Sequence, residues 1–314
     1  MDDTLYSVST QRAAQLLHVH ESSVKRWCNA ETLACSYTPG GHRRIPLAAL
    51  MQLAQDQGLP CGLLALHPFE APVWAGVNRA WSEASYGDLV ALLYGWLREG
   101  TDHLPVALYR FLLDMEFPLN ALFDWIITPV LHRVGEAWRA GQLTVGEEHR
   151  MTEIIRESLY ALRFDLVAPT HDEAAPRPMA IVGCERTGMH DLGAFMVRLL
   201  LMKAGWRVVY LGGRVPAEEY AAQQARHGAA LVCVSFPPPQ ALPDALHLVH
   251  MLSQLYDGSH PYRLALGGSG LQYGFSFSES PMPFQDLQYF DQMGLFSTWL
   301  ASFEAKHPGP SILT

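Results

Sequence analysis

Two short segments of the chain carry the residues best suited to bind a cofactor. The first holds Trp138 and, after nine intervening residues, the pair Glu148 and His149; the second holds His190 and Gly193. An imidazole can coordinate a metal ion, a carboxylate can orient an imidazole, and an indole ring can cover a flat ligand. The two segments together therefore predict a site that holds a planar metal cofactor from both faces.

The second segment belongs to a region in which strands and helices alternate. Buried strands are expected at 179–184, 207–211, 230–235 and 262–266, with helices at 191–204, 216–227 and 242–256, then a weak strand at 286–290 and a final helix. This alternation predicts a Rossmann-like, doubly wound (flavodoxin-like) parallel sheet over residues 178–306. His190 would then lie in the loop between the first strand and the helix that follows it, at the sheet edge where ligands bind.

The first segment belongs to a helical region. Apolar residues recur with helical period over 78–84 with 86–99, 103–115, 118–139 and 144–166. A four-helix bundle over residues 75–170 is the economical interpretation. Trp138 would end one helix and Glu148 would begin the next. Residues 58–76 and 172–178, rich in proline, are expected to be linkers.

Residues 1–74 are expected to form a DNA-binding domain that includes the first linker. Helices are predicted at 11–17 and 21–28 around a tight turn, followed by a hairpin over 33–46 and a helix at 47–57. The order and spacing are typical of a winged helix–turn–helix. Ser22 lies on the polar face of the second helix.

Bulk properties limit the remaining possibilities. The net charge is −9, but residues 1–60 hold five basic and five acidic residues, so one copy makes few phosphate contacts and an oligomer is favoured. No apolar run is long enough for a membrane span and the N-terminal segment lacks a signal peptide, so no membrane partner is expected. Five scattered cysteines without a CxxC pair disfavour a disulfide framework or a zinc site and favour a reducing cytoplasm.

The N-terminal pattern resembles the MerR family of winged helix–turn–helix regulators. The similarity rests on the Ser-Val-Lys-Arg-Trp-Cys run that ends the second helix and on the Gly-Gly-His-Arg-Arg wing. It implies two basic residues at the major groove or its flanking phosphates, and the wing on the DNA backbone. With Ser22, the expected DNA-binding residues are Lys25, Arg26, Tyr37, Arg43 and Arg44.

The loop after the first strand resembles a cobalamin-binding motif, acid-x-His-x-x-Gly. It lacks the GxGxxG of dinucleotide sites. The resemblance implies His190 as the lower ligand of cobalt and Gly193 at the nucleotide tail, while Gly188 stands where the motif has an acid. Glu185, Asp191 or a water would then have to hold the imidazole. Ser235, Gly267 and Gly268 are expected to line the tail channel.

Over nearly its full length the chain resembles the CarH/LitR group of cobalamin-dependent, light-responsive repressors. The resemblance implies no enzyme activity and adenosylcobalamin as cofactor, with Trp138 against the adenosyl group and Glu148 and His149 near its upper face. It also implies self-association as a homodimer or homotetramer on operator DNA in the dark, and release after light breaks the cobalt–carbon bond.

Two positions depart from that group and leave alternatives open. Gly188 lacks the carboxylate, and Arg139 stands where characterised light sensors have a histidine that captures cobalt. Arg139 has no free lone pair, so His132, His149 or water would occupy that position. The cofactor could instead be methylcobalamin, a linear tetrapyrrole or absent. A corrinoid methyl carrier or mutase subunit is a further alternative, which the DNA-binding domain disfavours.

Overall fold

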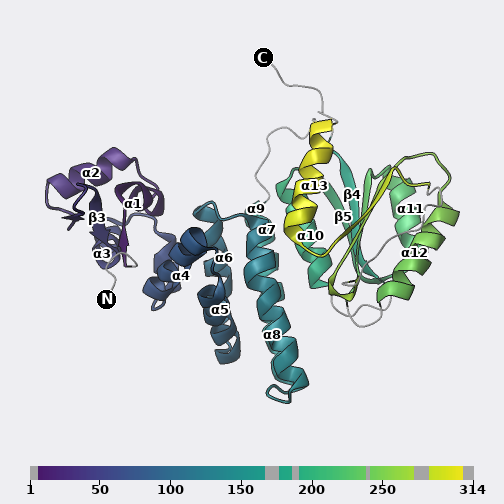
Figure 1. The fold of residues 1–314 in the computed structure, drawn as a ribbon, viewed down its shortest axis with the longest axis horizontal. Coiled ribbons are helices and arrows are strands. Elements are labelled where there is room, and N and C mark those ends of the chain that lie inside the picture. Colours follow the sequence, from purple (N-terminus) through teal and green to yellow (C-terminus); the bar gives the residue numbers. More distant parts are fainter. Residues whose placement is uncertain (1–5, 167–176, 186–190, 238–240, 272–282, 307–314) are drawn as a thin grey trace. The chain divides into compact units, whose positions relative to one another are not determined.

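The computed structural model describes residues 6–166, 177–185, 191–237, 241–271 and 283–306 (Figure 1). The chain divides into two compact units, Met1–Leu162 and Arg163–Thr314. Among the described residues, no helix is long and apolar enough to cross a membrane.

The first unit begins with the expected winged helix–turn–helix. Its elements are β1 (Ser7–Val8), α1 (Thr10–Leu16), α2 (Glu21–Asn29), β2 (Ser36–Tyr37), β3 (Arg43–Pro46) and α3 (Leu47–Gln57). The strands form an antiparallel sheet in the order β1-β3-β2. Gly41, with φ +77°, lies in the turn of the wing, where a left-handed backbone favours glycine. Ser9 caps α1, because its hydroxyl accepts a hydrogen bond from the amide of Arg12 at 3.2 Å.

Residues 58–76 are not a linker, and that prediction was wrong. A 3₁₀ turn spans Gly62–Leu66 and helix α4 spans Glu70–Glu83. Pro72 does not prevent this helix, because it lies in the first turn, where the amide hydrogens have no partner within the helix. Val73, Trp74 and other apolar residues of α4 are buried, so packing rather than local sequence decides this segment.

The remaining helices of the first unit follow the expected pattern with one irregularity. They are α5 (Gly87–Glu99), α6 (His103–Asp114), α7 (Leu119–Leu122), α8 (Thr128–Arg139) and α9 (Val145–Leu166). The single helix expected over 118–139 is divided by a π-helical segment, Phe123–Ile127. Pro129 explains this segment, because its missing amide hydrogen leaves the carbonyl of Trp125 without its usual partner.

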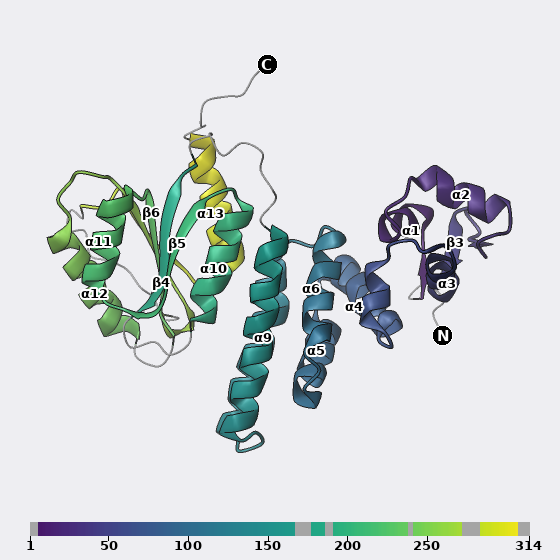
Figure 2. The ribbon, with the colours of Figure 1, turned by 180° about the vertical axis from the view of Figure 1, so that it is seen from behind.

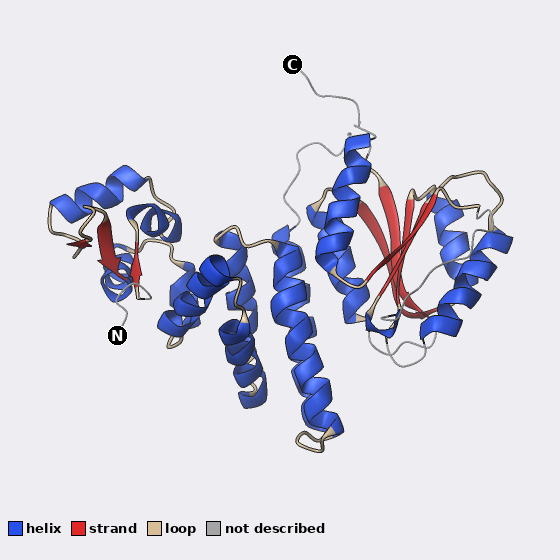
Figure 3. Cartoon of the chain, viewed as in Figure 1, coloured by secondary structure: helices blue, strands red, loops and turns tan. Residues whose placement is uncertain are grey.

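The second unit is a doubly wound sheet of five parallel strands, as predicted. In spatial order they are β5 (Arg207–Val215), β4 (Met179–Glu185), β6 (Leu231–Ser235), β7 (Arg263–Gly267) and β8 (Asp286–Phe290). The helices are α10 (Leu192–Lys203), α11 (Ala217–His227), α12 (Ala241–Leu255) and α13 (Met293–Lys306). Figures 2 and 3 show α10 and α13 on one face of the sheet and α11 and α12 on the other. From β4 the chain first adds β5 on one side, and then crosses to β6 on the other side of β4. The carboxyl ends of β4 and β6 are therefore the topological switch point of the sheet.

Candidate functional site

The carboxyl ends of three neighbouring strands bring together the motif residues of the second unit. Cys184 of β4 pairs with Ser235 of β6, and Ser235 pairs in turn with Gly267 of β7. Two of the residues predicted to line a nucleotide tail therefore lie side by side at the switch point, where doubly wound sheets bind their ligands.

Gly193 extends this arrangement to the first turn of α10. A Cβ atom placed on Gly193 would lie 2.9 Å from the hydroxyl oxygen of Ser235, closer than real side chains approach. Glycine at this position therefore lets α10 pack directly against the end of β6.

The adjoining end of β7 carries two glycines, because other parts of the backbone pack too closely there for a side chain to fit. A Cβ atom on Gly267 would lie 2.8 Å from the carbonyl oxygen of Phe290, and one on Gly268 would collide with the backbone of Phe236. Gly268 also has φ +113°, a conformation that other residues rarely adopt. Close packing within the protein therefore requires glycine at all three positions.

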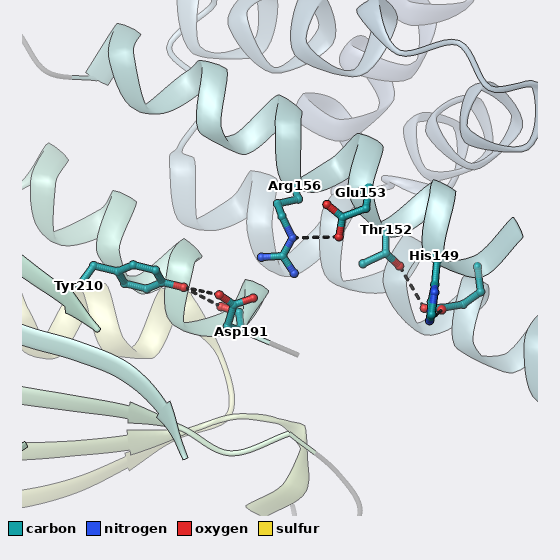
Figure 4. Close-up of polar contacts among 7 residues, drawn as sticks. His149, Thr152, Glu153, Arg156, Asp191 and Tyr210 are labelled. Atoms are coloured by element: carbon teal, nitrogen blue, oxygen red, sulfur yellow. Dashed lines mark hydrogen bonds and ion pairs between the residues drawn. The ribbon is translucent and has the colours of Figure 1, made fainter. Parts of the chain in front are cut away.

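His190, the predicted cobalt ligand, and Gly188, which stands where the motif has an acid, lie outside the described residues. The two carboxylates that flank this loop are described. Glu185 is buried at the end of β4. Asp191 precedes α10, and one of its carboxylate oxygens accepts a hydrogen bond from the hydroxyl of Tyr210 at 2.8 Å (Figure 4).

The side chains beside this loop are held in a buried, acidic environment. Burial, and then the charges of Asp191 and Glu185, raise the pKa of the Cys184 thiol to about 12. Both carboxylates therefore act on the same thiol at the end of β4.

The other predicted cofactor residues belong to the first unit, where a short connection joins α8 to α9. Trp138 lies in the last turn of α8 and is 47% exposed. Glu148 and His149 lie in the first turns of α9, with side chains 17% and 70% exposed. The Thr152 hydroxyl donates a hydrogen bond to Oε1 of Glu148 at 3.1 Å (Figure 4).

The pair of Glu148 and His149 is only loosely joined. Nε2 of His149 lies 3.5 Å from Oε2 of Glu148. The imidazole remains accessible because 70% of this side chain is exposed. Thr144 and Glu147 fix the start of α9 with a capping box, in which each side chain bonds to the other residue's amide at 3.2 and 2.7 Å. The exposed indole and imidazole thus stand on well-defined helix ends.

The predicted DNA-binding residues lie on α2 and on the wing. Nζ of Lys25 forms an ion pair with Glu21 at 3.1 Å. A hydrogen bond from Thr10, and then one from Lys25, hold the pKa of Glu21 below its ordinary value. Ser22 and Arg26 lie on the same helix.

The wing is attached to α2 by a contact that the sequence did not predict. The guanidinium of Arg43 donates a hydrogen bond to Oδ1 of Asn29 at 2.8 Å and lies 5.5 Å from the ring centre of Tyr37. Arg43 pairs with Tyr37 across the hairpin, and Arg44 pairs with Ser36. No local signal identifies Asn29, or Tyr210 in the second unit, because each acts on a residue from another element.

Three regions of the chain match known domain families. Residues 8–58 match a helix-turn-helix domain, residues 96–163 match a B12 binding domain, and residues 179–279 match a second B12 binding domain. The helix–turn–helix and the Rossmann-like fold predicted from the sequence are thereby confirmed.

Two curated proteins are similar over 102 residues. The HTH-type transcriptional repressor CarH of Myxococcus xanthus is 35% identical, covering 32% of this chain and 32% of that protein. A corrinoid protein of Desulfitobacterium hafniense is 24% identical, covering 32% of this chain and 47% of that protein. The matched region thus spans about a third and about half of the length of these relatives.

A solved structure has the same fold over a longer stretch. The monomethylamine corrinoid protein of Methanosarcina barkeri covers 70% of this chain and 100% of its own, with a TM-score of 0.51 and 14% identity. Taken together, the matches show a helix-turn-helix domain joined to two B12 binding domains, in a chain that is similar over about a third of its length to a CarH repressor.

Proposed function

We propose that this chain is a light-responsive transcriptional repressor rather than an enzyme. In the dark it binds operator DNA as a homo-oligomer, a dimer or tetramer stabilised by adenosylcobalamin, and in the light it releases that DNA. The observation that carries the proposal is the presence of a helix-turn-helix domain and two B12 binding domains in one chain that is similar to a CarH repressor. A repressor that acts on DNA would work in the cytoplasm.

The second unit would bind the lower side and the tail of the cofactor. His190 would coordinate cobalt, and Glu185 or Asp191 would hold the far nitrogen of its imidazole in place of the acid missing at Gly188. The nucleotide tail would pass Gly193, Ser235, Gly267 and Gly268. The support is that Ser235 and Gly267 lie side by side at the topological switch point, where doubly wound sheets bind their ligands.

Residues of the first unit would contact the upper side. When bound, adenosylcobalamin supplies a cobalt–carbon bond that visible light breaks. Trp138 would pack against the adenosyl group, with Glu148 and His149 beside it. The support is the position of this indole in the last turn of α8, with 47% of its surface open to solvent; Trp125 is 46% exposed as well, but its ring stacks on Tyr86.

This exposure gives the switch a physical basis. Burying the indole against a ligand stabilises the ligand-bound arrangement of the protein by about 25 cal/mol for each Å² of apolar surface removed from water. Loss of the group that covers Trp138 removes that stabilisation and favours the arrangement without the ligand. Arg139 offers no lone pair to cobalt, so this residue would not coordinate the metal after illumination.

DNA binding would use Ser22, Lys25 and Arg26 from α2 together with Tyr37, Arg43 and Arg44 from the wing. The DNA-binding domain carries equal numbers of acidic and basic side chains within residues 1–60. A single copy therefore binds weakly, and linking several copies raises the effective concentration of each head at its site. Release of DNA would follow from dissociation of the oligomer.

Two alternatives remain distinct from this proposal. Gly188 and Arg139 would also suit a regulator that uses methylcobalamin, a linear tetrapyrrole or no cofactor. The similarity to two corrinoid proteins favours a corrinoid methyl carrier as a second candidate. The helix-turn-helix match at residues 8–58 supports the regulator, since methyl transfer needs no DNA-binding domain.

The test uses the purified full-length chain reconstituted with adenosylcobalamin, with methylcobalamin or with a linear tetrapyrrole, and left without any of them. An operator is first selected from random-sequence duplexes by the adenosylcobalamin form in the dark. Absorption spectra, size-exclusion elution and gel shifts are then recorded before and after green light. We expect a larger, DNA-bound species in the dark and a smaller, unbound species in the light, with adenosylcobalamin only.

Variants make this test specific to the proposed site. His190→Ala should weaken cobalamin binding, and Trp138→Ala should weaken the dark oligomer. Trp125→Ala is the matched control, because Trp125 is 46% exposed in the same helical region but is not assigned to the cofactor. Gel shifts that are identical in dark and light would remove the light switch, and equal cobalamin affinity in His190→Ala would remove the cobalt ligand.

A further inference from the structure

Two contacts join helix α1 of the DNA-binding domain to the helices that follow this domain in the first unit. Cζ of Arg12 lies 3.9 Å from the ring centre of Trp81 in α4. Nε2 of His18 lies 2.9 Å from Oδ2 of Asp114, the last residue of α6. Arg12 belongs to the first turn of α1 and His18 follows its end, so the DNA-binding domain is attached at both ends of one helix.

The backbone at His18 adopts a conformation that favours glycine, with φ +50°. The amide of His18 donates to the carbonyl of Gln15 at 3.2 Å, and the amide of Val19 donates to the carbonyl of Ala14 at 3.0 Å. These are the two hydrogen bonds of a Schellman motif, in which glycine is the usual residue at this position. A histidine here is unfavourable for the backbone, and the contact of its imidazole with Asp114 compensates for that cost.

Asp114 is also unfavourable for its own helix unless it has a partner. A carboxylate at the end of a helix lies at the negative pole of the helix dipole, and α6 has no basic residue in its last turn. An ionised carboxylate only accepts hydrogen bonds, so Nε2 of His18 is the donor. The DNA-binding domain thereby supplies the group that α6 lacks.

The contact at the other end of α1 is fixed on both of its sides. Nη1 of Arg12 donates a hydrogen bond to Oε1 of Gln15 at 2.7 Å, which holds the guanidinium along α1. Trp81 packs edge-on against Trp74, with ring centres 6.1 Å apart, and Trp74 is 1% exposed. A guanidinium over the face of an indole is an attractive arrangement. The buried core of the helical bundle is therefore linked to α1 through one aromatic ring.

The segment between the DNA-binding domain and α4 provides a third attachment. Leu63 and Leu66 are fully buried, and a Cβ atom on Gly62 would lie 3.2 Å from the ring of Phe111 in α6. The connection is therefore packed against the bundle. Attachments at three separate points fix the orientation of the domain as well as its position.

We propose that Arg12 and His18 are positioning residues, through which the helical bundle holds the DNA-binding domain in one orientation. Helix α2 would then be carried by the bundle, and an oligomer of this chain would accept operators with one spacing between half-sites. The consequence for DNA rests on the proposed function, whereas the fixed orientation rests only on the contacts of α1.

Backbone ¹⁵N relaxation of the full-length protein without cofactor tests the fixed orientation directly. In the parent protein, residues 7–57 and helix α5 should share one rotational correlation time. A variant with both Arg12→Ala and His18→Gly should show a shorter correlation time for residues 7–57 alone. Glycine suits the backbone at position 18, so this variant should still fold. Asp114→Ala leaves the DNA-binding domain unaltered and should shift the correlation time in the same direction.

Two matched controls remove similar contacts that do not join α1 to the bundle. Arg133→Ala removes a guanidinium 4.0 Å from the ring centre of Tyr94, and both residues belong to the bundle. His67→Ala removes an imidazole 2.8 Å from the carboxylate of Glu70, three residues further along the chain. Neither variant should change the correlation time of residues 7–57. A parent domain that already tumbles faster than α5, or a double variant identical to the parent, would overturn the proposal.

Gel shifts then test the consequence for DNA with the operator selected in the dark. Lengthening the spacer between its half-sites by about 5 bp turns one half-site by roughly half a helical turn. The parent should lose on the order of 10²-fold in affinity, because avidity is lost when the geometry forbids simultaneous binding. The variant with Arg12→Ala and His18→Gly should lose much less. Equal losses would refute the effect on spacing, whereas failure to select any operator would count against the proposed function and leave the relaxation result intact.

Discussion

Gly193 and Ser235 approach each other so closely that a Cβ atom on the glycine would overlap the serine hydroxyl. Gly193 belongs to the first turn of α10 and Ser235 to the end of β6, and a Cβ atom on the glycine would lie 2.9 Å from the serine hydroxyl. The next nearest atom of Ser235 is its own Cβ, at 4.0 Å from the same point. A single oxygen atom is therefore the obstacle to a Cβ atom at position 193.

This relationship predicts the outcome of a double-mutant cycle. Gly193→Ala should lower the free energy of unfolding by about 1–2 kcal/mol, because the added methyl group overpacks the contact. In a Ser235→Ala background the same change should be neutral or should stabilise by about 0.5–1 kcal/mol, since alanine is the better residue in a helix. Urea unfolding of the four proteins measures both values. An equal loss in the two backgrounds would show that the hydroxyl is not the obstacle.

The hydrogen bond from Tyr210 to Asp191 should stabilise the start of α10. Tyr210→Phe keeps the ring and removes the donor, so we expect the free energy of unfolding to fall by about 1 kcal/mol. Tyr256→Phe is a matched control, because the contact of Tyr256 with the ring of Tyr262 does not need the hydroxyl. Denaturant unfolding of both variants is the measurement, and equal stabilities would mean that the 2.8 Å hydrogen bond contributes nothing.

Trp138 should matter little for folding, in contrast to the buried tryptophans of the same unit. Trp138→Ala should lower the free energy of unfolding by about 1 kcal/mol or less, whereas Trp96→Ala should lower it by about 3–5 kcal/mol because it leaves a cavity. Thermal unfolding without any cofactor separates the two. A large loss in Trp138→Ala would assign this indole to the bundle core and not to a ligand.

The capping box of α9 predicts a dependence on pH. Bonds from the backbone and side chain of Thr144 lower the pKa of Glu147 from 4.5. A carboxylate whose pKa is lowered by folding contributes stability that is present above its unfolded value and lost as the pH falls through the folded value. Stability should therefore decline below pH 4.5, and less so in Glu147→Gln, whose side chain does not titrate. Unfolding curves between pH 6 and pH 3 test this, and parallel profiles would contradict it.

The Pro-rich stretch after α3 shows where local sequence misleads. Residues 58–76 lack a helical apolar period, yet α4 begins at Glu70 and buries Trp74. Proline in the first turn of a helix is harmless, and the apolar residues that follow it pack against the rest of the unit. The π-helical segment before Pro129 is a similar case, because the spacing of apolar residues predicts one continuous helix over 118–139 and does not reveal this irregularity.

What the sequence by itself determined is the order of the domains, the parallel sheet and most element boundaries, because these follow from the local spacing of apolar residues and turns. It also predicted that Ser235 and Gly267 line one site, and neighbouring strands place these two residues side by side at the switch point. Only the tertiary structure decided which residues touch across elements: Gly193 with Ser235, Tyr210 with Asp191, and Arg43 with Asn29. Such contacts depend on strand register and helix packing, which are set by the whole core and leave no trace in local spacing.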